Sequence, residues 1–335
     1  MLNPFDNTAF SMTALTAAIN ILPNNYDRLA TMGLFPDKPQ RFRQVSIEER
    51  NGILTLLPTQ PVGSPGTVGV RGKRRLRSFA IPHIPHDDTL LPEEVQGIRA
   101  FGSESEVQTI ALVMADHLQT MRNKHSITLE HLRFGALKGE ILDADGSVLY
   151  NLYSEFGITP PSVVQFEFSN ANADIKKTCL DVLRRIEDNL KGERWTGVHC
   201  FVGEDFFDAL TGHPNVKEAY NRWQDGQALR SDMRNAFPFA GITFEEHRGR
   251  AWTGAQVERR FINATEGHCF PLGTLDTFAT YYAPADFNET ANTLAQPLYA
   301  KQEPRKFDRG TDLHTQSNPL PICHRPAVLV KVGMS

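Results

Sequence analysis

The sequence contains few cysteines, and the four it has stand far apart. They are Cys179, Cys200, Cys269 and Cys323, and no two of them form a CxxC pair. This spacing argues against a zinc motif and against a disulfide framework. We therefore expect four small buried thiols in a reduced compartment.

Signals for membranes, secretion and catalysis are also missing. No run approaches 18 consecutive apolar residues, and the first residues lack the basic and apolar regions of a signal peptide. None of the common motifs of nucleotide-binding proteins, metalloproteases or serine hydrolases occurs. We therefore expect no membrane partner, no cofactor and no catalytic residue.

Charge and composition describe an ordinary folded chain. The net charge is -4, whereas a dedicated nucleic-acid binder is usually basic. Hydrophobic residues make up 40% of the 335 positions, which is enough for a sizeable core. The proline-rich segments 36–92 and 284–326 are expected to be irregular. Compact enzymes rarely carry such long irregular stretches, so these segments favour a protein that reaches its neighbours.

The N-terminal 45 residues are expected to form an arm. A short amphipathic helix fits residues 10–22, but the segment has no periodicity that would build a core of its own. Such a terminal segment is ordered only when another surface holds it. We therefore expect the arm to contact other copies more than its own chain. Deleting residues 2–22 should then leave a soluble subunit that makes no stable assembly with other copies.

A long two-stranded ribbon is predicted next. Strands near 44–57 and 73–84 flank a tip rich in glycine and proline. Because an isolated two-stranded ribbon is marginally stable in water, it should lie on a partner surface.

The ribbon carries the densest basic run of the chain: Arg71, Lys73, Arg74, Arg75 and Arg77. Three interpretations remain open for this run, namely contact with a neighbouring copy, simple solvation and DNA binding. We favour contact with a neighbour, because the ribbon needs a docking surface. The acidic candidates on the next helix are Glu104, Glu106 and Asp116.

The strongest helical signal covers residues 103–139. Ser103 and Glu106 fit a capping box, and Gly139 should end the helix. A break or two is expected near residues 125–127. The apolar stripe that should face a sheet consists of Val107, Ile110, Met114, Leu118 and Met121.

The rest of the chain mixes helices and strands, which predicts the α+β class. A hairpin should turn at Asp145-Gly146, and a helix near 173–190 should end at Gly192. The other predicted elements are strands at 163–168, 198–202, 241–246, 268–272 and 327–332, and helices at 204–211 and 214–223.

One cluster could bind a metal. His83, His86 and Asp87 lie in the sequence HIPHDD, and histidine and aspartate are metal ligands. Two prolines interleave them, which removes a helical presentation, so we favour a turn whose aspartates bind backbone donors. A metal-dependent enzyme using these three residues remains the alternative function, beside a DNA-binding protein using residues 71–77.

Several stretches together resemble the lambda-type major capsid protein E family of tailed bacteriophages. They include MLNPFDNTAFSMTALTAAIN, IEERNGILTLLPT, RSFAIPHIPHDD, LPEEVQGIRAFG, HLRFGALKGEILDADGSVLYNLYSEFGI and the C-terminal PLYAKQEPRKFDRGTDLHTQSNPLPICHRPAVLVKV. The resemblance spans nearly the whole chain. It implies the tailed-phage capsid fold and a structural protein that self-assembles into the icosahedral head shell.

The resemblance also implies a layout and partners. The layout is an N-terminal arm at 1–45, an extended loop at 46–90, a peripheral domain with a spine helix at 91–195, an axial domain at 196–290 and a return to the peripheral domain at 291–335. The partners would be further copies in pentamers and hexamers, a decoration protein, a portal and a separate scaffold protein, with double-stranded DNA in the lumen. Assembly would take place in the host cytoplasm and the product would be the virion capsid.

Overall fold

The computed structural model describes residues 11–21, 27–50, 74–94, 110–222 and 233–335. The chain forms two compact units, each made of segments that are distant in the sequence. Unit 1 comprises Met1–Val45, Ala80–Phe134 and Ala279–Ile322, and unit 2 comprises Ser46–Phe79, Gly135–Phe278 and Cys323–Ser335. Among the described helices, none is long and apolar enough to cross a membrane.

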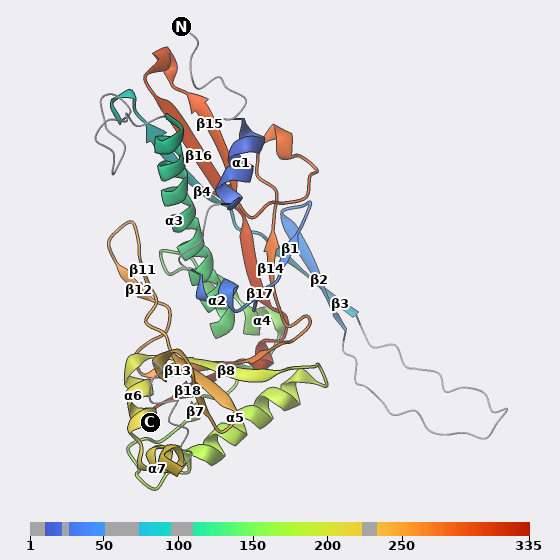
Figure 1. Ribbon diagram of the computed structural model, residues 1–335. Helices are drawn as coiled ribbons and strands as arrows, with labels where there is room; N and C mark the ends of the chain where they lie inside the picture. Colours follow the sequence, from blue (N-terminus) through green and yellow to red (C-terminus); the bar gives the residue numbers. More distant parts are fainter. Residues whose placement is uncertain (1–10, 22–26, 51–73, 95–109, 223–232) are drawn as a thin grey trace, which may run out of the picture. The chain divides into compact units, whose positions relative to one another are not determined.

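A three-stranded sheet and two helices form the centre of unit 1 (Figure 1). The strands are antiparallel and lie in the order β15 (Tyr299–Pro304), β16 (Thr311–Ser317) and β4 (Ile84–Leu90). Helices α1 (Met12–Ile21) and α3 (Ile110–Lys138) bury their apolar residues against this sheet. The shared core cluster consists of Leu15, Ile19, Leu90, Val113, Met114, Leu118, Met121, Leu298, Ala300 and Leu313.

The predicted stripe of the long helix is confirmed over its described part, because Met114, Leu118 and Met121 are buried. The capping box at residues 103–106 lies outside the described residues, and Gly139 follows the helix with φ +83°. The expected break near residues 125–127 is wrong, since α3 is continuous. His125 lies within the helix and its Nε2 is 3.0 Å from Thr315 Oγ1 on β16, so a distant strand supplies its polar partner.

Three other expectations about unit 1 are wrong. The segment 284–326 is not irregular, because it contains β15, β16 and β17 (Pro319–Cys323). HIPHDD forms most of strand β4 instead of a turn. The N-terminal segment does have a core in its own chain, because Leu15 and Ile19 on α1 are buried in unit 1.

The remaining described elements of unit 1 are short. Helix α2 (Arg28–Thr31) is capped by Asp27, whose Oδ1 accepts a hydrogen bond from the Ala30 N–H at 2.8 Å. Strand β1 (Asp37–Pro39) pairs in parallel with β14 (Phe278–Tyr282), which lies between β1 and β17. The 3-10 helices are η3 (Pro92–Glu94), η6 (Asn288–Thr290) and η7 (Lys306–Asp308).

A six-stranded mixed sheet forms the centre of unit 2. Its order is β7 (Val164–Gln165), β18 (Val330–Gly333), β13 (Glu266–Leu272), β8 (Gly197–Val202), β10 (Ile242–Glu246) and β9 (Phe237–Phe239). Helix α5 (Ile175–Leu190) buries Ile175, Cys179, Val182, Ile186 and Leu190 at helical spacing, as predicted. The helix ends at Leu190, and its C-cap is Lys191, one residue before the predicted Gly192.

Hairpins and short helices complete unit 2. The shorter helices of unit 2 are α4 (Leu152–Phe156), α6 (Glu204–Gly212) and α7 (Pro214–Arg222), and its 3-10 helices are η5 (Met233–Asn235) and η8 (Pro326–Val328). Strands β5 (Glu140–Leu142) and β6 (Val148–Asn151) form the predicted hairpin, and β11 (Arg250–Trp252) pairs with β12 (Glu258–Arg260). The turn of the first hairpin is wider than the two residues predicted, because the Asp143 N–H binds the Ser147 carbonyl at 2.8 Å.

All four cysteines are buried, in agreement with the expectation of small buried side chains. Burial raises the pKa of the Cys323 thiol to about 12, which keeps it neutral.

Candidate assembly surfaces

The predicted ribbon exists as a separate two-stranded sheet of β2 (Gln44–Arg50) and β3 (Arg74–Ala80). Its tip and the residues Arg71 and Lys73 lie outside the described residues. The structure describes only the backbone of Arg74 and Arg75, which places both at the start of β3.

The base of the ribbon is fixed by aromatic packing within unit 2. Arg77 Nη2 donates a hydrogen bond to the Phe156 carbonyl at 3.0 Å, and its guanidinium lies 5.2 Å from the Phe156 ring centroid. Phe79 is buried, with its ring centroid 5.5 Å from that of Tyr150. Arg77 therefore anchors the ribbon to its own chain, a role that the basic pattern alone did not reveal. Leu76, the residue before Arg77, is 72% exposed.

The acidic residues proposed as partners are described only in part. Glu104 and Glu106 lie outside the described residues. Asp116 is exposed on α3, and Leu112 lies one turn earlier and is also exposed. This helix thus presents one carboxylate and one apolar side chain to its surroundings.

The HIPHDD residues point to separate partners within unit 1. His83 Nδ1 is 3.0 Å from Asn318 Oδ1, and Asp87 pairs with His314 across the strands. His86 Nε2 is 3.0 Å from the Lys124 ammonium. A single ion would need these ligands to converge, and within the described residues no group of three or more His, Cys, Asp or Glu could hold a metal.

His117 on α3 is held between two carboxylates that the sequence did not connect with it. Its Nδ1 lies 2.7 Å from Asp88 Oδ2, and its Nε2 lies 2.9 Å from Glu94 Oε2. Partial burial works against the imidazolium, but the two carboxylates outweigh it and raise the pKa of His117. The ion pairs tie η3 and β4 to the long helix.

A buried charge network joins α3 to the start of the chain. The Arg133 Nη1 atom donates to both oxygens of Asp27, at 3.1 and 3.0 Å, and Arg133 is only 3% exposed. Glu130, 2% exposed, accepts a hydrogen bond from the Leu29 N–H at 3.1 Å. Burial and the neighbouring Asp27 carboxylate raise the pKa of Glu130 well above the usual range. This shift favours the protonated form of Glu130.

We expect Glu130→Gln to flatten the dependence of stability on pH. The folded-state pKa lies above the unfolded value, so this group's contribution is fully present below the unfolded pKa and is lost as pH rises through the folded pKa. Glutamine keeps an acceptor for the Leu29 N–H but cannot ionise. The free energy of unfolding, measured with urea between about pH 5 and pH 9, should fall less in the variant than in the wild type. The exposed Glu187→Gln is the control, and equal slopes for Glu130→Gln and wild type would contradict the assignment.

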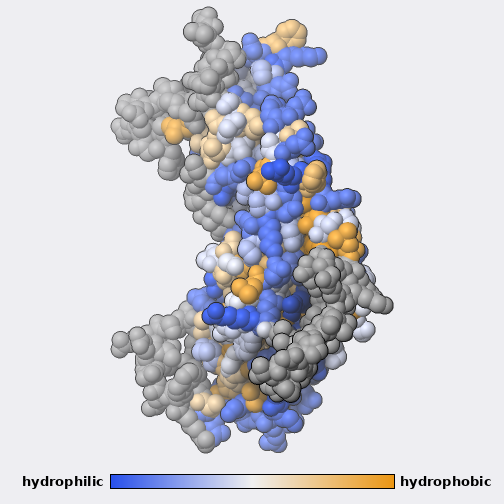
Figure 2. Space-filling model, turned by 90° about the vertical axis from the view of Figure 1, so that its right-hand side faces the viewer, coloured by the Kyte–Doolittle hydropathy of each residue, from blue (hydrophilic) through white to orange (hydrophobic). Residues whose placement is uncertain are grey.

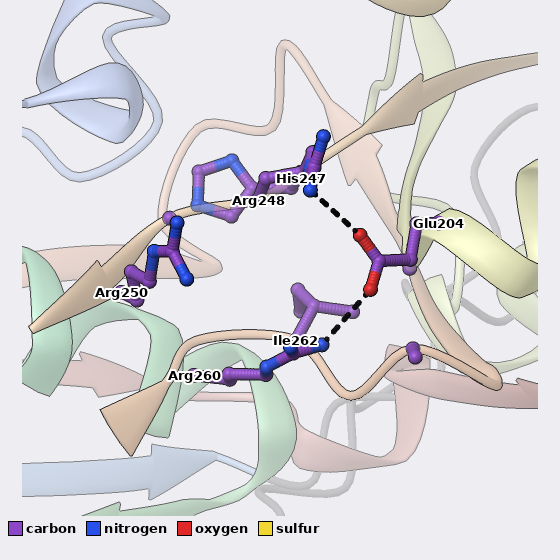
Figure 3. A pocket seen from close by; sticks show the side chains of 9 residues that line it. Glu204, His247, Arg248, Arg250, Arg260 and Ile262 are labelled. Atoms are coloured by element: carbon purple, nitrogen blue, oxygen red, sulfur yellow. Dashed lines mark hydrogen bonds and ion pairs between the residues drawn. The ribbon is translucent and has the colours of Figure 1, made fainter. Parts of the chain in front are cut away.

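A small opening in unit 2 is lined by arginines around one carboxylate (Figure 3). Glu204, the first residue of α6, binds Arg260 and Arg248, each at 3.1 Å. Arg250 pairs with Glu258 across the hairpin at 3.2 Å. The opening measures about 20 Å³, which is room for about one water molecule. Each of these arginines has a carboxylate partner. We therefore interpret the group as a set of ion pairs that stabilises the base of the β11–β12 hairpin.

The surface itself is mixed in character. Figure 2 shows that hydrophilic residues cover much of the described part of this face, with apolar residues in separate patches. Twelve large hydrophobic side chains of the described residues are exposed, and they belong to many different elements. The exposed large hydrophobic side chains are therefore dispersed over the described elements.

Comparison with known proteins decides the family. The family model described as phage major capsid protein E matches residues 11–334, almost the entire chain. The chain belongs to the phage major capsid protein E family. It is 29% identical to the major capsid protein of Salmonella phage Felix O1, covering 99% of this chain and 98% of that protein. It is 28% identical to the major capsid protein of Pseudomonas phage KPP10, covering 96% of each.

Solved structures show the same fold at low sequence identity. A prophage protein of E. coli CFT073, described as a capsid protein, has a TM-score of 0.60 at 13% identity and covers 97% of this chain and 99% of its own. The capsid of the myovirus phage XM1 gives a TM-score of 0.51 at 9% identity, with 95% of each chain covered. The predicted α+β capsid fold is therefore confirmed.

Membership of the phage major capsid protein E family settles the class of function. The chain is a structural protein that forms the head shell of a tailed phage, and shell assembly from its own copies follows from this. Neither the metal-dependent enzyme nor the DNA-binding alternative is supported by the family or by the relatives.

Proposed function

We propose that in the shell each β2–β3 ribbon lies across an adjacent subunit, with its basic strand facing acidic side chains. The observation that carries this proposal is that the ribbon is a sheet of two strands only, separate from the three larger sheets of the described residues. Two strands cannot bury their own side chains, and the described anchors, Arg77 and Phe79, fix only its base.

The proposed contact is electrostatic and repeated. Arg71, Lys73, Arg74 and Arg75 would meet carboxylates of the neighbour, and Asp116 is an exposed candidate on α3. Glu104 and Glu106 remain candidates from the sequence. A single exposed pair contributes only about 0–1 kcal/mol, but the same contact recurs in every subunit and is coupled to one docking event.

The proposed function also includes the partners of the shell. Pentamers and hexamers of the chain would assemble in the host cytoplasm with a separate scaffold protein and a portal, enclose double-stranded DNA, and bind a decoration protein. The resemblance to lambda-type capsid proteins supports these partners.

The five-part layout also remains a proposal. In a shell, residues 1–45 would serve as the arm, 46–90 as the extended loop, 91–195 and 291–335 as the peripheral domain, and 196–290 as the axial domain. The boundaries between the two compact units differ from those of this layout, because residues 135–195 and 196–278 belong to the same unit.

Hydrogen exchange tests the ribbon contact directly. The amides of β2 and β3 should exchange at least about tenfold more slowly in assembled shells than in free subunits, because docking covers exposed backbone. The amides of β8, in the middle of the unit 2 sheet, are the internal control and should change little. Unchanged exchange in the ribbon would show that it does not dock on a neighbour.

A further inference from the structure

The tip of the β15–β16 hairpin has an unusual backbone. Phe307 has φ +63° and ψ +25°, and Asp308 follows with φ +55°. Two successive residues other than glycine in the left-handed region are unfavourable, and the large aromatic side chain of the first makes the conformation a genuine outlier. Strained backbone of this kind concentrates where a structure makes functional contacts.

The strained conformation exposes its aromatic ring. Phe307 is 87% exposed, more than any other large hydrophobic residue described. Within the described residues, the guanidinium carbon of Arg309 lies 5.7 Å from the centroid of this ring. Both strain and exposure are unfavourable in the free subunit, so neither is explained by packing within the chain.

The tip is nevertheless held in one conformation. The Arg305 N–H binds the Gly310 carbonyl at 3.0 Å, and the Asp308 N–H binds the Arg305 carbonyl at 3.0 Å. Arg305 Nε also forms an ion pair with Asp312 Oδ1 at 2.8 Å. Strands β15 and β16, which carry the tip, are paired over six residues each. A preorganised tip loses little conformational entropy when it binds.

We propose that this tip, residues 305–310, is a contact to a second copy of the chain, with Phe307 as its hydrophobic anchor. The proposal rests on the family's shell function, in which each subunit packs against its own copies, and is independent of the ribbon contact. The tip carries three basic residues, Arg305, Lys306 and Arg309, and one acidic residue, Asp308, while each copy has a net charge of -4. An aromatic anchor surrounded by arginines is the composition typical of interface hot spots.

Replacing Phe307 with glycine separates this role from a role in folding. Glycine removes the ring and tolerates the positive φ, so the free subunit should melt at the same or a higher temperature. Assembly should instead need at least about tenfold more subunit, as expected for the loss of a hot spot. Phe307→Asn also tolerates this backbone and should behave alike, whereas Phe307→Leu keeps an apolar anchor and should assemble much closer to wild type.

Photocrosslinking identifies the partner. A photoreactive aromatic amino acid at position 307 should link two copies of this chain in shells and give no such product from free subunits. Links only to another virion protein, or none in shells, would overturn the proposal, as would wild-type assembly by Phe307→Gly or a lower melting temperature of that variant. Shell formation by the wild-type chain tests the family function separately.

Discussion

Replacing Arg74 and Arg75 with glutamate should block or strongly slow shell assembly, while the thermal unfolding of the free subunit stays nearly unchanged. Both residues lie at the start of β3, between the tip of the ribbon and its anchored base. If β3 docks on carboxylates, reversal turns each attraction into a repulsion, and like-charge contacts are costly at interfaces. Light scattering would follow assembly, and scanning calorimetry would follow unfolding.

A matched control distinguishes a local contact from a change in net charge. Lys176→Glu with Lys177→Glu on α5 alters the net charge by the same amount, and both lysines are exposed. They lie in the first turn of the helix, where acidic residues are favourable. This control should assemble normally.

Salt gives a second test of the same contact. Raising the salt concentration should weaken wild-type assembly in the direction of the double variant, because exposed charge pairs are screened. If the Arg74 and Arg75 variant assembled normally but packaged DNA poorly, the basic run would face the lumen, and the DNA-facing interpretation would replace the proposal.

Local periodicity was enough to predict the larger elements. Met114, Leu118 and Met121 recur at helical spacing, and the structure buries all three on α3. Helix α5 and strands β8, β10 and β13 lie close to their predicted positions for the same reason. In these segments, the local pattern and the final packing agree.

The errors arose where a distant segment supplies the missing partner. The polar run around His125 suggested a break, but Thr315 on β16 provides its hydrogen bond. HIPHDD was interpreted as a turn because its prolines argue against a helix. Its partner strand β16 begins more than 200 residues later, so the local sequence does not show the pairing. From the sequence alone, Glu130 and Arg133 would be interpreted as solvent-exposed charges on a helix. The local sequence does not indicate that Asp27 binds Arg133 in the protein interior. Nothing in the sequence indicates the positive φ of Phe307.

Truncating the buried face of α1 should destabilise the free subunit, contrary to the expectation that the N-terminal segment is dispensable for its folding. Leu15 is 3% exposed and Ile19 is fully buried, both in the core of unit 1. The helix is also tied to its own chain by polar contacts, since Asn20 Nδ2 donates to the Leu298 carbonyl at 2.9 Å. The Ala300 N–H donates to Thr16 Oγ1 at 3.1 Å.

The expected size of this effect follows from cavity formation. Leucine or isoleucine to alanine in a core costs about 2–5 kcal/mol, against a total stability of about 5–15 kcal/mol. Leu15→Ala and Ile19→Ala should therefore each lower the melting temperature by several degrees, and the double variant should lose most of the stability of unit 1. The exposed Thr13→Ala on the same helix is the control and should change stability by less than about 0.5 kcal/mol. If the double variant melted like wild type and failed only in assembly, α1 would act between subunits, because its burial in unit 1 would then contribute nothing to folding.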